Sequence, residues 1–122
     1  MNFIIAPLAQ GDIVEILDWT EKNFGPRTMG RYRSLIRTAI DEVASNPELA
    51  GSTPHPEVAP AWRTYHLFHS RKNSGPRGQR IRNPRHLLLY RVTEDNVIEI
   101  ARVLHDSMEL TDHLPMEFRD EA

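Results

Sequence analysis

The stretch His86–Leu104, HLLLYRVTEDNVIEIARVL, contains two apolar segments separated by a short polar one. Both segments are rich in leucine, β-branched and aromatic residues, which is typical of strands. Residues 93–96 between them are of the kind that form tight turns. A third segment, WRTYHLF from Trp62 to Phe68, has the same strand-like character. The sequence therefore predicts three consecutive strands that pair as an antiparallel meander.

The residues before the meander predict one strand and two helices. Asn2–Ala6 is short and rich in aromatic and β-branched residues, as strands are. Residues 8–24 and 26–46 repeat apolar residues at helical spacing, and Gly25-Pro26 separates the two segments. The expected apolar positions are Leu8, Ile13, Ile16, Leu17 and Phe24 in the first helix, and Met29, Tyr32, Leu35, Ile36, Ala39, Ile40 and Val43 in the second.

These elements follow one another in the order β-α-α-β-β-β, which predicts an α+β fold. The antiparallel sheet is expected to carry the two helices, joined as a helical hairpin, packed on one face. Four prolines in residues 47–60 predict an irregular connection, and Asp106 or Ser107 is expected to begin a short last helix. The length suits a single domain, residues 1–122, whose acidic tail over residues 115–122 is expected to be flexible.

The composition excludes several classes of protein. The chain has no cysteine, so disulfides, thiol catalysis and cysteine-ligated metal sites are excluded. No apolar run approaches the roughly 18 residues that cross a bilayer. The N-terminus also lacks the pattern of a secretory signal. The sequence therefore predicts a cytoplasmic protein with no membrane partner, and no cofactor is expected.

Positive charge is concentrated in one part of a chain whose formal net charge is −2. Residues 58–93 contain no acid and hold eight of the 15 basic residues. Most of these eight lie in residues 70–86, a stretch interrupted by glycine and proline. The stretch has three interpretations: a solvated loop, a site for nucleic-acid phosphates, or a site for an acidic partner protein.

We favour contact with a macromolecule over a merely solvated loop. No aromatic residue lies between Phe68 and Tyr90, so stacking against nucleic-acid bases is not expected. The residues expected to bind the macromolecule are Arg63, Arg71, Lys72, Arg77, Arg80, Arg82 and Arg85.

The sequence resembles the RelE/ParE toxin superfamily over most of its length. The segment Pro84–Leu114, PRHLLLYRVTEDNVIEIARVLHDSMELTDHL, is similar to the C-terminal signature of that superfamily. There a strand ending in Tyr-Arg-Val precedes an acidic turn, an Ile-rich strand and a Val-Leu-His terminus. Residues 24–47, FGPRTMGRYRSLIRTAIDEVASNP, resemble its second helix, and residues 12–16 resemble its first. Arg63 stands where the superfamily usually has an arginine, and the details are closest to the ParE branch.

The resemblance implies a toxin of a type II toxin–antitoxin module, which inhibits growth and takes part in plasmid stabilisation. Its expected partner is a small ParD-like antitoxin of the ribbon-helix-helix type, whose C-terminal segment folds onto the toxin. ParE-like toxins poison DNA gyrase, whereas RelE-like toxins cut mRNA on the ribosome. The implied function is therefore inhibition of DNA gyrase. The alternatives are a ribosome-dependent mRNA endonuclease and an inactive homologue that only binds its partner.

Catalysis by this chain is not the favoured interpretation. Metal-free RNA cleavage needs a base, an acid, and a cation for the developing phosphate charge. The residues after Leu104 include no tyrosine or lysine, and six acids lie between Asp106 and the end of the chain. These acids would repel a phosphate backbone. If the chain does cut RNA, it is expected to be a metal-independent endoribonuclease whose candidate catalytic residues are His86, Tyr90, Arg91 and His105.

Two other polar features have a structural interpretation. Arg102 lies in an apolar strand and is expected either to pair with Asp106 or Glu99 or to face the antitoxin. No metal site is predicted, because the chain lacks cysteine and the spacing of His66 and His69 on a strand sends them to opposite faces.

Overall fold

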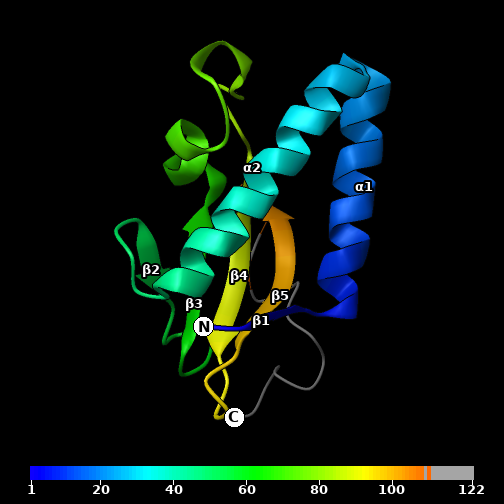
Figure 1. Cartoon of the computed structure of the whole chain (residues 1–122). Coiled ribbons are helices and arrows are strands. Elements are labelled where there is room, and N and C mark those ends of the chain that lie inside the picture. The colour runs from blue at the N-terminus through cyan, green and yellow to red at the C-terminus, as the bar shows by residue number, and fades with distance from the viewer. Residues whose placement is uncertain (109, 111–122) are drawn as a thin grey trace.

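The predicted hairpin forms the centre of the sheet. The computed structural model describes residues 1–108 and 110, and in it β4 (His86–Val92) pairs antiparallel with β5 (Ile98–His105). The turn between them holds Asn96 at φ 60°, in the left-handed region that asparagine tolerates better than most residues. β3 (Trp62–His66) pairs antiparallel with β4. The predicted three-stranded meander is therefore confirmed (Figure 1).

Two short strands extend the meander, and both differ from the prediction. β1 (Phe3–Ile5) runs parallel to β5, so the sheet, in the order β1-β5-β4-β3-β2, is mixed rather than wholly antiparallel. β1 is followed directly by the helices and not by a tight turn. No hairpin therefore forces it to run antiparallel to its neighbour. β2 (Ser52–Pro54) forms within the connection predicted to be irregular and pairs antiparallel with β3. Its proline is compatible with an edge strand.

The two helices form the predicted hairpin and cover one face of the sheet (Figure 1). α1 (Pro7–Phe24) and α2 (Pro26–Ser45) each begin with a proline, whose missing N–H is not needed in a first turn. Gly25 joins them at φ 92°, a conformation that favours glycine. The buried side of α2 agrees with the prediction except at Met29, which is half-buried; it consists of Tyr32, Leu35, Ile36, Ala39, Ile40, Val43 and Ala44.

The first helix buries less apolar surface than its sequence predicts. Leu8 and Phe24, expected on the buried side, are exposed, and so is the neighbouring Trp19. Leu8 lies in the first turn and Phe24 is the last residue of the helix, whose tip extends past the end of β5 in Figure 1. The predicted residues that do pack partly buried against the core are Ile13, Ile16 and Leu17.

A β-bulge in the central hairpin changes the face on which one arginine lies. Tyr90 lies opposite Ile100 on the face covered by the helices, where both join the main core. The register then shifts, so that Leu89 lies opposite Arg102. Leu89 belongs to a second, smaller cluster, which includes Ala101. Simple alternation along the strand would place Arg102 on the same face as Ile100. Because of the bulge, the two residues lie on different faces.

Arg102 pairs with a carboxylate other than the two that were named, Glu99 and Asp106, whereas its contact with the antitoxin stays a prediction. Its guanidinium donates to both carboxylate oxygens of Asp12 in α1, from Nε and Nη2 at 2.8 Å each. The backbone N–H of Val103 also donates to Asp12 Oδ2, at 2.9 Å. Because β1 pairs only as far as residue 100, Asp12 provides the acceptor that a longer β1 would have provided. The carboxylates of Glu99 and Asp106 pair with other arginines.

The segment between β3 and β4 is more ordered than the predicted loop. The strand expected to reach Phe68 ends at His66, and 3₁₀ helices follow over Leu67–Asn73 and Arg77–Gln79. In the part of the chain that is described, no helix is both long enough and apolar enough to cross a membrane. The tail over residues 115–122 lies outside the described residues, and so does the predicted last helix except for residues 106–108 and 110.

Candidate functional site

A hollow that we call the apolar groove lies where α1 and α2 meet, beside the start of β4 and the end of β5. Its volume is about 550 Å³. Trp19 and Phe24 are 59% and 63% exposed, and their rings meet edge to face with centroids 5.8 Å apart. The polar side chains that line it include Tyr32, His86 and His105. The groove thus combines exposed aromatic rings with a few polar groups.

Tyr32 and His86 form a hydrogen-bonded pair at the groove. Burial raises the pKa of Tyr32 to about 12, so the phenol keeps its proton. Burial, and then the neighbouring His105, lower the pKa of His86 to about 4, so its ring is neutral at pH 7. The backbone N–H of Arg85 donates to the Tyr32 oxygen at 3.3 Å. The phenolic hydrogen is then donated to His86 Nδ1 across 2.6 Å.

The carboxylate of Asp106 contacts two basic side chains beside the groove. The guanidinium of Arg85 donates to both of its carboxylate oxygens, with Nη2 2.9 Å from Oδ1 and Nε 3.0 Å from Oδ2. His66 Nε2 lies 3.0 Å from the same Oδ2. The hydrogen bond from Arg85 is the main cause that holds the pKa of Asp106 well below its usual range. The charge of Arg85 is therefore balanced within the protein.

Only two of the four candidate catalytic residues are brought together. His86 and His105 lie opposite each other on β4 and β5, with ring centroids 5.4 Å apart. Tyr90 is fully buried, and its hydroxyl contacts the hydroxyl of Ser52 and a backbone carbonyl. Arg91 donates to a carboxylate of Glu99 at 2.7 Å. Tyr90 and Arg91 thus make structural contacts away from the histidines.

The pair of histidines is poorly equipped for cleaving RNA. His86 already accepts a hydrogen bond at Nδ1 and stays neutral, and Arg85 is committed to Asp106. His105 is the more accessible ring, and its Nδ1 lies 2.8 Å from the hydroxyl of Ser107. Within the described residues, the groove therefore lacks an uncommitted cation that could stabilise the developing charge on a phosphate.

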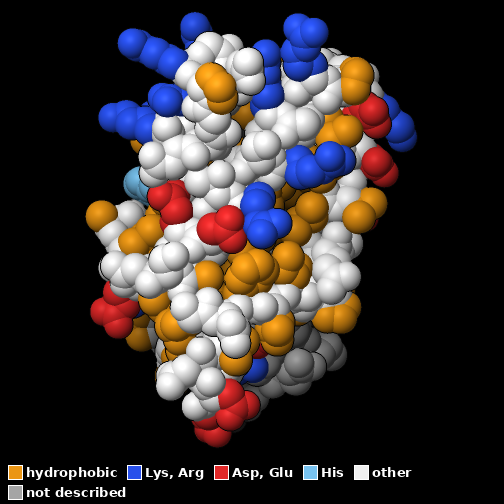
Figure 2. Space-filling model, in the orientation of Figure 1, with side chains coloured by type: hydrophobic (Ala, Val, Ile, Leu, Met, Phe, Trp, Pro, Cys, Tyr) orange, Lys and Arg blue, Asp and Glu red, His pale blue; other side chains and the backbone are white. Residues whose placement is uncertain are grey.

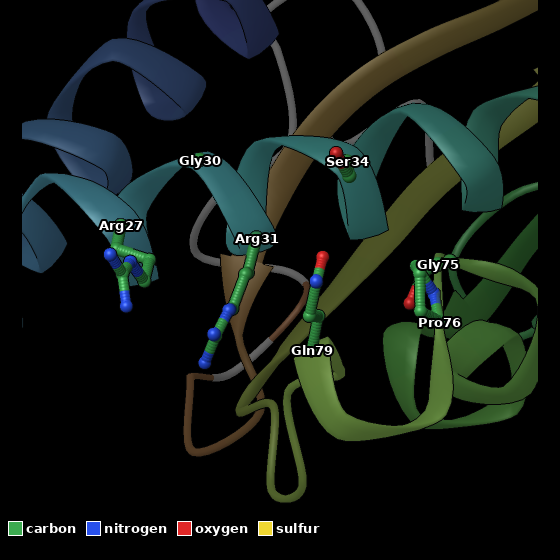
Figure 3. Close-up of a pocket in the computed structure, with 8 residues that line it drawn as sticks. Arg27, Gly30, Arg31, Ser34, Gly75, Pro76 and Gln79 are labelled. Carbon is green, nitrogen blue, oxygen red and sulfur yellow. The ribbon is translucent and has the colours of Figure 1, made fainter.

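A second hollow, the cationic cleft, separates the start of α2 from the loop at residues 74–79. Its volume is about 540 Å³. Arg27 and Arg31 extend from α2 on the side where Gln79 lies, as Figure 3 shows. Gly30 and Gly75 also line the cleft, and a Cβ at either position would meet nothing within 4 Å. The cleft is thus open, polar and positively charged.

The five predicted macromolecule-binding residues from Arg71 to Arg82 fall into two groups. Some arginines shape the protein itself: Arg71 stacks 3.6 Å above the Phe68 ring and donates to the carbonyl of Arg82, and Arg80 donates to the carbonyl of Gly75. The others have neither a side-chain hydrogen bond nor an ion pair among the described residues, and they are Lys72, Arg77 and Arg82.

Two of the predicted residues are separated from the exposed basic group. Arg85 is paired with Asp106 beside the apolar groove. Arg63 donates to the hydroxyl of Ser52 at 2.7 Å, near the C-terminal end of α2. The structure therefore does not assemble all seven predicted residues into one surface.

Sequence reasoning missed Arg27 and Arg31, although the signal was present. Residues 22–40 contain five basic residues and no acid, the same pattern that drew attention to residues 58–93. Figure 2 shows that Lys and Arg side chains gather at the end of the molecule where these two segments meet. The histidines considered for a metal site have other contacts: His66 lies against Asp106 and His69 against Tyr65.

Comparison with known proteins places the chain among toxins. The family model described as "ParE toxin of type II toxin-antitoxin system, parDE" matches residues 3–110. The chain is also 28% identical over 113 residues to toxin ParE1 of Mycobacterium tuberculosis, in strains CDC 1551 / Oshkosh and ATCC 25618 / H37Rv. The alignment covers 93% of this chain and 97% of each relative. The resemblance found in the sequence is therefore confirmed, and the chain belongs to the ParE toxin family of type II toxin–antitoxin systems.

Proposed function

We propose that the chain, residues 1–122, acts in the cytoplasm as one toxin domain that inhibits DNA gyrase by binding to it. A small ParD-like antitoxin of the ribbon-helix-helix type neutralises it. The observation that carries this proposal is the match to the ParE toxin family over residues 3–110. A toxin of such a family has a cognate antitoxin, and gyrase is the target that the ParE resemblance implies.

The contacts of the candidate catalytic residues support binding rather than chemistry. A metal-free ribonuclease must bring an acid, a base and a cation to one phosphate. Here Tyr90 and Arg91 are held in structural contacts, and Arg85 is neutralised by Asp106. The remaining His86 and His105 lie in an apolar surrounding that suits a protein side chain better than a sugar-phosphate backbone.

The apolar groove supports the proposed antitoxin contact. An amphipathic segment binds by placing its apolar residues in such a groove. Trp19 and Phe24 provide exposed aromatic area of the kind that dominates binding energy in protein interfaces. The buried Tyr32 and the half-buried His86 are held by hydrogen bonds, so the groove is formed before its partner arrives.

A supercoiling assay tests the proposal. Purified toxin is added to gyrase, relaxed plasmid and ATP, and the products are separated with and without detergent treatment. We expect supercoiling to fall and cleaved plasmid to accumulate, and both effects to disappear when the toxin is first mixed with its antitoxin. Undiminished supercoiling at an excess of folded toxin would overturn the proposal. Growth arrest with cut transcripts would then indicate the ribosome as the target, and normal growth would indicate an inactive homologue.

A further inference from the structure

We propose that the cationic cleft binds the phosphate backbone of duplex DNA. The proposal goes beyond gyrase inhibition, because it concerns a direct contact between this chain and DNA that needs no gyrase. It rests on the charge, the lining and the accessibility of the cleft.

The positive charge that lines the cleft comes from α2. Arg27 and Arg31 lie four residues apart on this helix and therefore on one side of it. Arg77, on the opposite loop, follows the lining residue Pro76 but does not itself line the cleft. None of the three makes an ion pair with a carboxylate in the described part of the chain, residues 1–108 and 110. Their charges remain available to an anionic partner, although the protein as a whole has a net charge of −2.

The lining of the cleft adds neutral hydrogen-bonding groups to this charge. Ser34 and Ser74 bring hydroxyl groups from the two walls, and Gln79 brings an amide. Gly30 and Gly75 leave the walls without side chains, so a bulky phosphodiester can come close to the backbone. Hydroxyl, amide and backbone N–H groups are common partners of DNA phosphates, beside arginine.

The loop wall is held in place by its own hydrogen bonds. Arg80 Nε donates to the carbonyl of Gly75 at 2.9 Å, and the backbone N–H of Gln79 donates to the carbonyl of Pro76 at 2.8 Å. The hydroxyl of Ser74 donates to the carbonyl of Arg71 at 3.0 Å. These contacts close the turn without using Arg77, whose side chain stays at the surface.

The chemistry of the cleft favours duplex DNA over an acidic peptide. A peptide that binds tightly needs apolar anchors as well as charge, and the exposed aromatic pair Trp19 and Phe24 lines the apolar groove and not the cleft. Single strands bind by stacking their bases on free aromatic rings. Phe68, in the 3₁₀ helix before the loop, does not line the cleft, and Arg71 stacks on its ring at 3.6 Å. A contact made by charge and hydrogen bonds alone suits the backbone of a duplex.

Fluorescence anisotropy of a labelled duplex, without gyrase, tests the proposal on the purified full chain. The critical comparison is Arg27→Ala/Arg31→Ala against Arg33→Ala/Arg37→Ala, because both pairs lie four residues apart on α2 and remove the same charge. We expect the first variant to weaken binding by about tenfold and to lower the salt slope by about 2. The second variant should change affinity by less than about twofold. Circular dichroism verifies that both variants fold.

Four results would contradict the proposal, three from the variants and the peptide and one from single-stranded DNA. The first is equal weakening by the two variants, which would indicate general attraction by net charge. The second is unchanged binding by Arg27→Ala/Arg31→Ala. The third is tight binding of a polyglutamate peptide to the wild type that the same variant abolishes while the duplex does not bind. A single-stranded DNA arm should bind more weakly than the duplex, because the cleft offers no stacking surface; equal or tighter binding would contradict the duplex assignment.

Discussion

The apolar groove and the cationic cleft lie on two sides of the same half of α2, yet they are built in opposite ways. Tyr32 faces the groove, is buried and bonds to His86. Arg31, its neighbour in sequence, lines the cleft. The side chains of the groove are held by contacts within the protein. The arginines of the cleft, in contrast, make no ion pair with a carboxylate among the described residues. One helical turn can therefore serve two partners of different chemistry, because adjacent residues project about 100° apart around a helix.

The largest expected difference between groove and cleft variants is in their affinity for the antitoxin. Trp19→Ala/Phe24→Ala should weaken binding of the proposed ParD-like antitoxin by about a hundredfold, or about 3 kcal/mol. The reason is that the exposed aromatic area of the groove is lost. Arg27→Ala/Arg31→Ala should change the same affinity by less than about threefold. Isothermal titration calorimetry at low and high salt measures both, and a larger loss for the arginine variant would reverse the assignment of the two surfaces.

Lowering the pH should destabilise the protein by protonating a side chain of the groove, and the arginines of the cleft should not contribute. His86 has a pKa of about 4 in the folded protein, below the ordinary value of 6.5. The unfolded chain therefore takes up the proton first, and stability is lost as the pH falls from about 6.5 to about 4. After allowance for partial exposure, the loss should be on the order of 2 kcal/mol.

Urea unfolding at several pH values measures this dependence. His86→Gln should flatten it between about pH 6.5 and about pH 4, and Arg31→Ala should leave it unchanged. A wild type whose stability is constant over that range would contradict the neutral, buried state of His86. A further fall at lower pH is expected, because the pKa of Asp106 is held low by Arg85 and this stabilising pair is lost when the carboxylate takes up a proton.

The smallest expected difference between groove and cleft is in the free energy of unfolding of single variants at neutral pH. Tyr32→Phe removes the hydroxyl that accepts from the Arg85 N–H and donates to His86 Nδ1. Two polar groups lose their partner, which should cost about 1 kcal/mol of the free energy of unfolding. Arg31→Ala should stay within about 0.5 kcal/mol of the wild type, because a partly exposed cation with no ion pair among the described residues contributes little to stability. Equal losses would indicate that both surfaces belong to the structural core.

The features that the sequence predicted well depend on local signals. The composition of two neighbouring segments predicted β4 and β5, and the helical spacing of α2 predicted buried side chains such as Leu35, which lies in the main core. The family resemblance rests on the order of the same segments. His86 and His105 were named beforehand only as candidate catalytic residues, and the sequence did not predict the groove that they line.

The features that the sequence did not predict depend on contacts between distant segments. The pairing of Asp12 with Arg102 joins residues that are 90 positions apart, and it follows from a bulge and from the short length of β1. The cleft likewise arises only when α2 and the loop approach each other, which brings Arg27 and Arg31 opposite Gln79. Charge counts along the chain could have identified the segment on each side of the cleft. They could not have predicted that the two segments lie close together in the fold.

The central claim is that this toxin acts by binding and not by cutting RNA. The most direct measurement is to incubate the purified wild-type protein with ribosomes that are translating a reporter mRNA, and to map the ends of the transcript. We predict that the reporter stays intact at an excess of toxin. Cleavage at defined codons that is abolished by His86→Gln or His105→Gln in a folded variant would contradict the account.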